Sequence, residues 1–171
     1  MTDGPLATMI AAAEALTERP VEQWHPTHCG DSYMVIKADG SWLHEGNPIH
    51  RPQLVRLFAS LLRREADGSH VLVTPGEKLT IVVEDAPFVA VEVACEGAGK
   101  ARRLAFRLNT GDVVHAGPEH AIGVRDGRPY LHVRRGLEAR IGRAVFYELA
   151  ELALADGGDH VWSDGARFAL A

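Results

Sequence analysis

The stretch YMVIKADGSWLH, residues 33–44, predicts a β-hairpin, and the rest of the fold can be worked out from it. Residues 33–38 contain the β-branched and aromatic side chains that strands favour. Asp39-Gly40 follows, a dipeptide that tolerates the positive φ angles of a type I′ turn, and residues 41–44 return as the second strand. A second turn at residues 46–48 then leads to a helix that Pro52 opens, because proline suits the first helical position.

The helix after Pro52 has apolar side chains at the spacing of one buried face. These are Leu54, Leu57, Phe58, Leu61 and Leu62. Asp67-Gly68 ends the helix, and turn-forming residues then separate three predicted strands. The strands lie at residues 70–74, 79–84 and 88–94, and a charged stretch at 96–103, a strand at 104–108 and a turn at 109–112 follow.

The pattern then begins again. A turn at Asp126-Gly127, a returning strand and a helix with Leu137, Ile141, Val145 and Leu149 inward repeat the order of the first half. Five pairs of residues match in this order, and their separations rise only from 87 to 90 residues. The pairs are Asp39 and Asp126, His44 and His132, Phe58 and Phe146, Asp67 and Asp156, and His70 and His160.

We therefore predict an α+β protein with duplicated hairpin-helix-hairpin halves at residues 29–98 and 99–171. Residues 1–28 are predicted to form an N-terminal helical arm and connector, because residues 5–16 are amphipathic and Glu18-Arg19-Pro20 ends the pattern. Each half has one small sheet and one amphipathic helix to cover it. Two such halves predict a crevice between them, where ligand sites are favoured.

Composition excludes several classes of protein. The 171 residues have a net charge of -5, so no overall field attracts nucleic acid or an anionic membrane. Two cysteines are too few for the disulfide framework of a small secreted domain. No apolar run approaches the roughly 18 residues of a membrane span, and the start lacks the basic region of a signal peptide. We expect a cytoplasmic protein without membrane contact.

Several strings resemble a bacterial family that is catalogued as domain of unknown function 1285. The first are KADGSWLHEGNPIHRP at residues 37–52, LVRLF at 54–58, LVTPGEK at 72–78 and VEDAPF at 83–88. Asn109, PYL at 129–131 and GLEA at 136–139, which leads to Arg143, continue the similarity. Residues 1–28 lie largely outside it.

This resemblance implies a duplicated α+β core whose C-terminal half is similar to a pleckstrin-homology fold. It also implies a ligand site at the interface of the halves, for a nucleotide-like molecule, and a role in signal transduction. The leading prediction is therefore a small-molecule-binding or regulatory module rather than an enzyme.

Arginines near predicted helix starts are the first candidates for ligand contact, because guanidinium groups bind phosphate or carboxylate with two hydrogen bonds. Arg51 and Arg134 are expected near the starts of the two helices, where backbone amides also favour anions. Solvated surface arginine is the plain alternative for both residues. Polar turn residues complete the predicted ligand set: Thr74, Lys78, Asp85 and Asn109.

Two other functions stay open. A protein-interaction domain would use the arginine-bearing faces, whereas net acidity and 6% aromatic residues disfavour nucleic-acid binding. A hydrolase would use Glu84 or Asp85 with a histidine, but neighbours on a strand point to opposite faces. His25, His28 and Cys29 lack a second cluster with zinc-ligand spacing. We therefore predict no catalytic residue, metal or cofactor.

Overall fold

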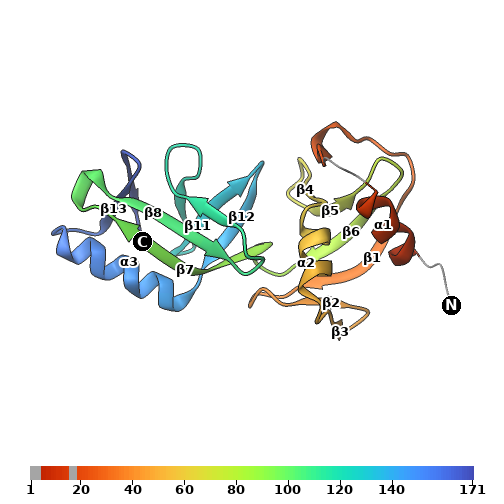
Figure 1. Ribbon diagram of the computed structural model, residues 1–171, viewed down its shortest axis with the longest axis horizontal. Helices are drawn as coiled ribbons and strands as arrows, with labels where there is room; N and C mark the ends of the chain where they lie inside the picture. The colour runs from red at the N-terminus through yellow and green to blue at the C-terminus, as the bar shows by residue number, and fades with distance from the viewer. Residues whose placement is uncertain (1–4, 16–18) are drawn as a thin grey trace. The chain divides into compact units, whose positions relative to one another are not determined.

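The computed structural model describes residues 5–15 and 19–171, and the chain divides into two units (Figure 1). Unit 1 ends at Asp85 and unit 2 begins at Ala86. Each unit contains one six-stranded sheet, so the predicted α+β class with two similar halves is confirmed. Among the described helices, none is both long and apolar enough to span a membrane.

The sheet of unit 1 has the strand order β3-β2-β1-β6-β5-β4. Its first and last strands along the chain, β1 and β6, run parallel at the centre, whereas the other neighbouring pairs are antiparallel. The strands are β1 (Cys29–Ile36), β2 (Trp42–His44), β3 (Asn47–Pro48), β4 (Leu62–Arg64), β5 (His70–Val73) and β6 (Lys78–Val83).

The sequence Ala-Asp-Gly-Ser occurs twice in unit 1 and forms the same turn each time. Residues 38–41 join β1 to β2, and residues 66–69 join β4 to β5. In each turn the aspartate Oδ1 accepts a 2.9 Å bond from the serine N–H and a 2.6 Å bond from its hydroxyl. Both glycines have positive φ angles, but neither aspartate does. The type I′ geometry predicted for Asp39-Gly40 is therefore wrong, because the aspartate holds a loop in which glycine alone is left-handed.

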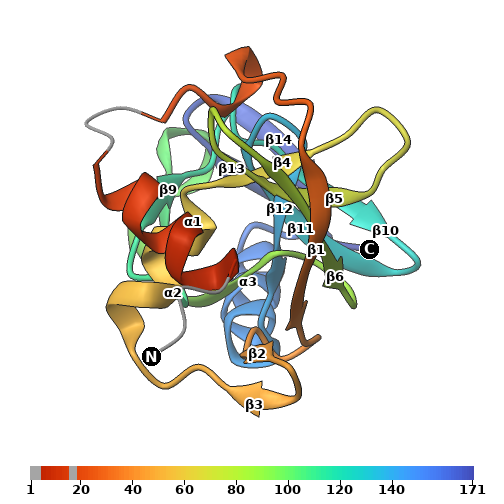
Figure 2. The same ribbon diagram turned by 90° about the vertical axis from the view of Figure 1, so that its right-hand side faces the viewer.

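Two helices of unit 1, α1 (Pro5–Glu14) and α2 (Pro52–Ala59), contact each other (Figure 2). Phe58 of α2 is fully buried, and its ring stacks on Trp42 with 6.4 Å between centroids. Trp42 is therefore part of the core. The helix is shorter than predicted, because Leu61 and Leu62 are buried beyond its end, where β4 begins.

The N-terminal segment contains α1 and the short helix η1 (Val21–Gln23). α1 occupies the part of the chain in which the sequence predicts a helix, and Met9 and Ala13 are fully buried. Leu16 and Glu18, which the prediction also used, lie outside the described residues.

The sheet of unit 2 has the order β10-β11-β12-β7-β8-β9, with β7 and β12 parallel at the centre. α3 (Arg143–Ala155) follows β12 and packs on β7, and β13 and β14 form a separate hairpin. The strands are β7 (Phe88–Glu96), β8 (Arg103–Leu108), β9 (Val113–His115), β10 (Ile122–Arg125), β11 (Arg128–Arg134), β12 (Leu137–Ile141), β13 (His160–Ser163) and β14 (Ala166–Ala169), with η2 (Gly99–Ala101) before β8.

The duplication is present, but its register differs from the predicted one. Read from its other edge, the order in unit 2 is β9-β8-β7-β12-β11-β10. If β7 is counted as the first strand of its sheet, this order is identical to that of unit 1, so β7 corresponds to β1 and β12 to β6. The offset near 88 residues does not describe this pairing, because it matches the central strand β1 with the edge strand β10. The likeness of the C-terminal half to a pleckstrin-homology fold stays a prediction.

The division between the units lies earlier than the predicted end of the first half at residue 98. Residues 88–94 were predicted as a strand of that half, yet β7 pairs with β8 and β12 in unit 2. A run of strand-forming side chains does not indicate which sheet the strand will join, because the partners are distant in sequence.

The second predicted helix also begins later than expected. Leu137 and Ile141 have helical spacing, but residues 137–141 form β12, in which Leu137, Ala139 and Ile141 alternate as buried residues. The period of two is that of a strand with one buried face, and it is the period that the structure follows.

Candidate functional site

Two of the predicted ligand residues are held in their own turns. Thr74 is buried, and its Oγ1 accepts hydrogen bonds from the N–H groups of Gly76 (3.3 Å) and Glu77 (3.2 Å). Asn109 makes two hydrogen bonds to Val89 of β7. Its N–H donates to the Val89 carbonyl at 2.8 Å, and its Oδ1 accepts from the Val89 N–H at 3.0 Å. These bonds give both side chains a structural role.

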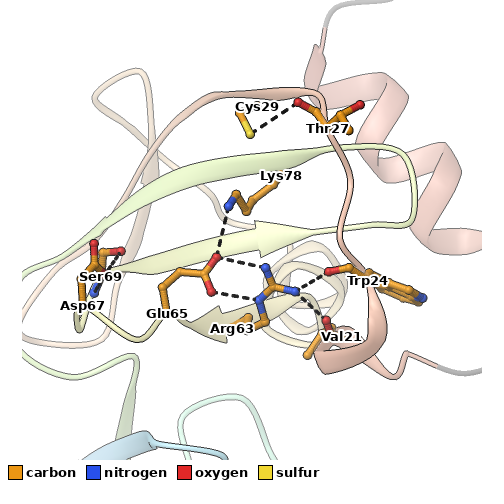
Figure 3. A network of polar contacts seen from close by, with 9 residues as sticks. All are labelled: Val21, Trp24, Thr27, Cys29, Arg63, Glu65, Asp67, Ser69 and Lys78. Carbon is orange, nitrogen blue, oxygen red and sulfur yellow. Dashed lines mark hydrogen bonds and ion pairs between the residues drawn. The ribbon is translucent and has the colours of Figure 1, made fainter.

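Lys78 belongs to a polar network in unit 1 (Figure 3). Its Nζ lies 3.4 Å from Glu65 Oε1, and Arg63 donates to both oxygens of that carboxylate, at 3.0 and 3.2 Å. Arg63 Nη1 also donates to the carbonyls of Val21 (2.8 Å) and Trp24 (2.6 Å). The bond from Arg63 is the main reason why the pKa of Glu65 is lowered. The network ties the segment around η1 to β4.

The remaining three predicted residues have different surroundings. Arg51 directly precedes α2, as predicted, but its side chain is exposed and does not cap the helix. Asp85 is half-buried at the end of unit 1. Arg134 ends β11 and so is not at the start of α3. Its guanidinium lies 5.5 Å from the centroid of the Phe88 ring, and burial lowers its pKa.

The candidate carboxylate Glu84 binds two residues of the first hairpin. Its Oε1 accepts a 3.0 Å hydrogen bond from the Ala38 N–H, and Oε2 pairs with Lys37 at 3.1 Å. The bond from Ala38 is the main cause of the lowered pKa of Glu84. A general acid needs the opposite shift, so the environment of Glu84 does not favour that role.

The cluster of His25, His28 and Cys29, which leads into β1, is exposed. His28 Nε2 lies 3.9 Å from Glu77, and Cys29 Sγ contacts the Thr27 carbonyl at 3.8 Å. Within residues 5–15 and 19–171, no group of three His, Cys, Asp or Glu side chains is placed to hold a metal ion.

Acid is expected to destabilise unit 1 more than unit 2. Four carboxyl groups of unit 1 have lowered pKa values, and a group whose pKa is lower in the folded state stabilises the fold fully above its unfolded pKa. That contribution is lost as the pH falls through the folded value. In the described part of unit 2, the shifted pKa values belong to arginines, which do not titrate in acid. The four groups are Asp39, Glu65, Asp67 and Glu84.

Hydrogen exchange, corrected for intrinsic rates and followed from about pH 6 to about pH 3, measures this difference. Peptides from β1 to β6 should lose protection at a higher pH than peptides from β7 to β12. Asp67→Asn keeps an oxygen for the Ser69 N–H but cannot titrate. It should therefore reduce the difference between the pH values at which the two sheets lose protection. Equal loss of protection in both sheets would contradict the expectation.

A pocket of about 410 Å³ lies in unit 2 beside the first turns of α3. The turn between β10 and β11 with the start of β11, the end of β12 and the start of α3 form it. We call it the arginine pocket. It is lined by Arg128, Arg140, Arg143, Phe146 and Tyr147, together with Gly127, Pro129 and Ile141.

The strand side of the arginine pocket depends on hairpin geometry. Asp126 and Gly127 have φ angles of 52° and 73°, as a type I′ turn requires, and this turn places Arg128 at the first position of β11. Arg140 lies opposite Tyr130 in the ladder between β11 and β12. Because side chains alternate along a strand, Arg128 and Tyr130 lie on one face of the sheet, which is also the face of Arg140.

The helix side depends on a close approach of α3 to β7. Gly142 precedes α3, and its N–H donates to the Ala90 carbonyl at 3.0 Å. A Cβ atom at Gly142 would lie 2.9 Å from the same oxygen, so a larger residue would push the helix away. Arg143, Phe146 and Tyr147 follow at the spacing of one helix face, which directs them to the same side.

The lining of the arginine pocket includes no carboxylate. Arg128 and Arg143 are exposed, and neither has an ion-pair partner among the residues that the structure describes. Arg140 is half-buried. The first N–H groups of α3 add a partial positive charge at this end of the helix. The electrostatic character of the pocket therefore favours an anion.

A carboxylate does lie close to the arginine pocket in the sheet, but it is paired. Glu138 stands two residues before Arg140 on the same face of β12, and Arg125 Nη1 lies 2.5 Å from its Oε1. The Arg125 guanidinium also covers the ring of Tyr130, 3.8 Å from its centroid. Arg125 thus crosses β11 to reach Glu138.

The sequence did not single out Arg128, Arg140 and Arg143 as a set. Apolar spacing predicts a helix that includes residues 137–141, and such a helix has Arg134 rather than Arg143 near its start. Two local signals pointed to the pocket: Arg128 after an Asp-Gly turn, and Arg143 after Gly142 at the true helix start.

The comparisons with known proteins agree across the chain. The family described as domain of unknown function (DUF1285), N-terminal domain, matches residues 19–86, and protein of unknown function (DUF1285), C-terminal domain, matches residues 87–170. The curated proteins include no match.

Two crystal structures of DUF1285 family proteins are similar to the chain. The protein from Silicibacter pomeroyi DSS-3 is 41% identical, with a TM-score of 0.84 over 99% of this chain and 96% of that one. The protein from Shewanella baltica OS155 is 28% identical, with a TM-score of 0.58 over 73% of this chain and 96% of that one. Because both family domains match in order and together cover residues 19–170, the chain belongs to the DUF1285 family.

Proposed function

We propose that the protein is a small-molecule-binding module that holds an anionic ligand in the arginine pocket. The observation that carries the proposal is the convergence of Arg128, Arg140 and Arg143 on one pocket without a lining carboxylate. Arginine binds phosphate and carboxylate groups with paired hydrogen bonds. A volume of about 410 Å³ lies in the range of small-molecule sites.

The same proposal includes the biological role that the resemblance implies, in which a nucleotide-like ligand controls a signalling process. Phe146 and Tyr147 supply aromatic surface beside the arginines, as a ligand with a planar group requires. The ligand set predicted from the sequence, with Arg51 and Arg134 at an interface of the halves, would serve the same ligand chemistry. The arginines and aromatic rings of the arginine pocket support that chemistry within one unit.

A cytoplasmic module is part of this proposal. Cys29 and Cys95 are both exposed and both are free thiols. Exposed free thiols are typical of proteins in a reducing compartment.

Replacing Arg143 with alanine is expected to weaken ligand binding at least about tenfold, because a hydrogen bond to a charged group contributes about 1.5–3 kcal/mol. Isothermal titration with pyrophosphate and with nucleoside monophosphates measures the change. The Arg128→Ala variant should behave in the same way.

Arg56→Ala is the matched control, since Arg56 is an exposed arginine of α2 in unit 1 and the change in net charge is identical. Its affinity should equal that of the unmodified protein. Equal losses of affinity in Arg143→Ala and Arg56→Ala would show that net charge alone causes the effect, and this result would contradict binding in the arginine pocket. Saturable binding that only Arg51→Ala weakens would move the ligand to the site predicted from the sequence.

A further inference from the structure

We infer that the exposed side of α3 is an interface between two copies of this chain, which associate through antiparallel α3 helices. Four exposed residues form this side of the helix, and we call them the α3 stripe: Arg143, Tyr147, Glu151 and Leu154. The partner is a protein, and its recognition does not require a ligand in the arginine pocket.

The position of the α3 stripe on the helix is the first step. Arg143, Tyr147 and Glu151 follow one another at a spacing of four residues, and Leu154 follows Glu151 by three, so all four lie on one side. The other side of α3 packs on β7 and β13 and contains the buried residues Val145, Leu149 and Ala153. The α3 stripe therefore faces away from the core of unit 2.

The apolar part of the α3 stripe is the second step. Leu154 is 75% exposed, more than any other large apolar side chain whose burial the structure describes, and Tyr147 is 59% exposed. The Tyr147 ring contacts the Phe146 ring edge to face, with 6.2 Å between centroids. Removing apolar surface from water is favourable, and a ring that is already in contact loses little freedom when it is covered. The α3 stripe therefore gains from contact with another apolar surface.

The charges of the α3 stripe identify the partner. Arg143 and Glu151 are exposed, and neither has an ion-pair partner among the residues that the structure describes. They lie four residues before and four residues after Tyr147. A second copy, related by a twofold axis beside Tyr147, places each Arg143 against Glu151 of the other copy. The α3 stripe is thus complementary to itself, and the macrodipoles of two antiparallel helices also attract each other.

The length of α3 determines how tightly two copies associate. α3 has 13 residues and is therefore about 20 Å long. An interface made by one helix face of this length belongs to the small, transient class. We expect a dissociation constant of about 100 µM, so the chain should be a monomer at about 5 µM and largely a dimer at about 500 µM.

Charge reversal tests the interface. Sedimentation equilibrium over this range of concentration measures the dissociation constant. Arg143→Glu and Glu151→Arg should each weaken association at least about tenfold, because each replacement creates two like-charge contacts across the twofold axis. The double variant Arg143→Glu with Glu151→Arg should return to within about threefold of the original value, because both ion pairs form again with reversed polarity.

Arg56→Glu is the matched control, since it reverses an exposed arginine of α2 and should leave association unchanged. The double variant also controls for folding, because an acidic residue at the start of a helix suits its macrodipole. A chain that stays monomeric at about 500 µM would overturn the interface, as would a double variant that associates no better than the single variants.

Pyrophosphate separates this interface from the proposed function. Glu151 does not line the arginine pocket, so Glu151→Arg should weaken association without weakening pyrophosphate binding. Arg143 and Tyr147 belong to both sites, and saturating pyrophosphate should therefore shift the chain toward the monomer. Binding of pyrophosphate without this shift would contradict an interface through Arg143. Association that follows the charge reversals without any binding of pyrophosphate would contradict the proposed function alone.

Discussion

Replacing Asp156 with alanine is expected to destabilise unit 2 by about 3 kcal/mol. The carboxylate of Asp156 lies at the end of α3 and accepts a 2.5 Å hydrogen bond from Arg102 Nη1. Arg102 is 4% exposed, and its Nε makes no hydrogen bond to the described residues. Asp156 also raises the pKa of Arg102 more than any other group. Its removal would leave a buried charge without compensation, which is among the most costly changes in a protein interior.

Arg102 also connects the elements that surround it. Its N–H donates to the Gly99 carbonyl of η2, and its own carbonyl accepts a 3.0 Å bond from the Asp164 N–H in the turn of the β13-β14 hairpin. Ser163 reinforces the same attachment, because its buried Oγ donates to the Ala116 carbonyl and accepts from the Leu104 N–H. Loss of the ion pair should therefore loosen α3 and the hairpin together.

Chemical denaturation followed by the fluorescence of Trp162 on β13 measures this effect. Asp159→Ala is the control, because its carboxylate is 82% exposed and its loss should change stability by less than about 0.5 kcal/mol. The double variant Arg102→Met with Asp156→Ala should recover part of the loss, since it removes the buried charge as well. If Asp156→Ala is as stable as Asp159→Ala, the result would contradict the role assigned to the pair of Arg102 and Asp156.

The second large effect is expected in unit 1, where Arg63→Met should cost about 2–3 kcal/mol. The Arg63 side chain is 14% exposed, and its four hydrogen bonds reach Glu65 and the carbonyls of Val21 and Trp24 (Figure 3). Methionine retains the apolar stem but removes the bonds from Arg63, which leaves Glu65 with Lys78 alone and the Val21 carbonyl with the Trp24 N–H alone. The segment around η1 should then detach from β4.

Limited proteolysis measures this detachment, because cleavage within residues 19–28 should become faster while the sheets of both units stay protected. Arg64→Met is the matched control, since the next residue along β4 is exposed. Similar cleavage rates in the two variants would show that the segment is held by something other than Arg63.

Local sequence signals predict the helices and strands of this fold better than they predict which strands pair with one another. The hairpin at residues 33–44 and the helix after Pro52 were found, because turn residues and apolar spacing act within a few positions. The same signals do not predict that β7 belongs to the sheet of unit 2, because its neighbours β8 and β12 are set by packing across the whole unit. The identity of the repeated turns at residues 38–41 and 66–69 follows from the repeated tetrapeptide Ala-Asp-Gly-Ser.

The candidate site was harder to predict than the fold for a related reason. Residues such as Thr74 and Asn109 are polar and lie at turns, as ligand residues often do, yet their side chains bond the backbone that they shape. Arg128, Arg140 and Arg143 belong to three elements, and only the true start of α3 brings them to one pocket. An error of a few residues in that start is enough to lose the site.

The central position of the first and last strands determines when each unit can fold during synthesis. In unit 1, Met34 and Ile36 of β1 stay without their parallel neighbour until β6 has left the ribosome. All six strands of that sheet precede Phe88, where β7 begins, so a nascent chain can finish one sheet before it starts the other. β12, which has the place of β6 in the second sheet, is synthesised only after β6 is available to pair with β1. Vectorial synthesis therefore favours correct pairing in two sheets of identical strand order.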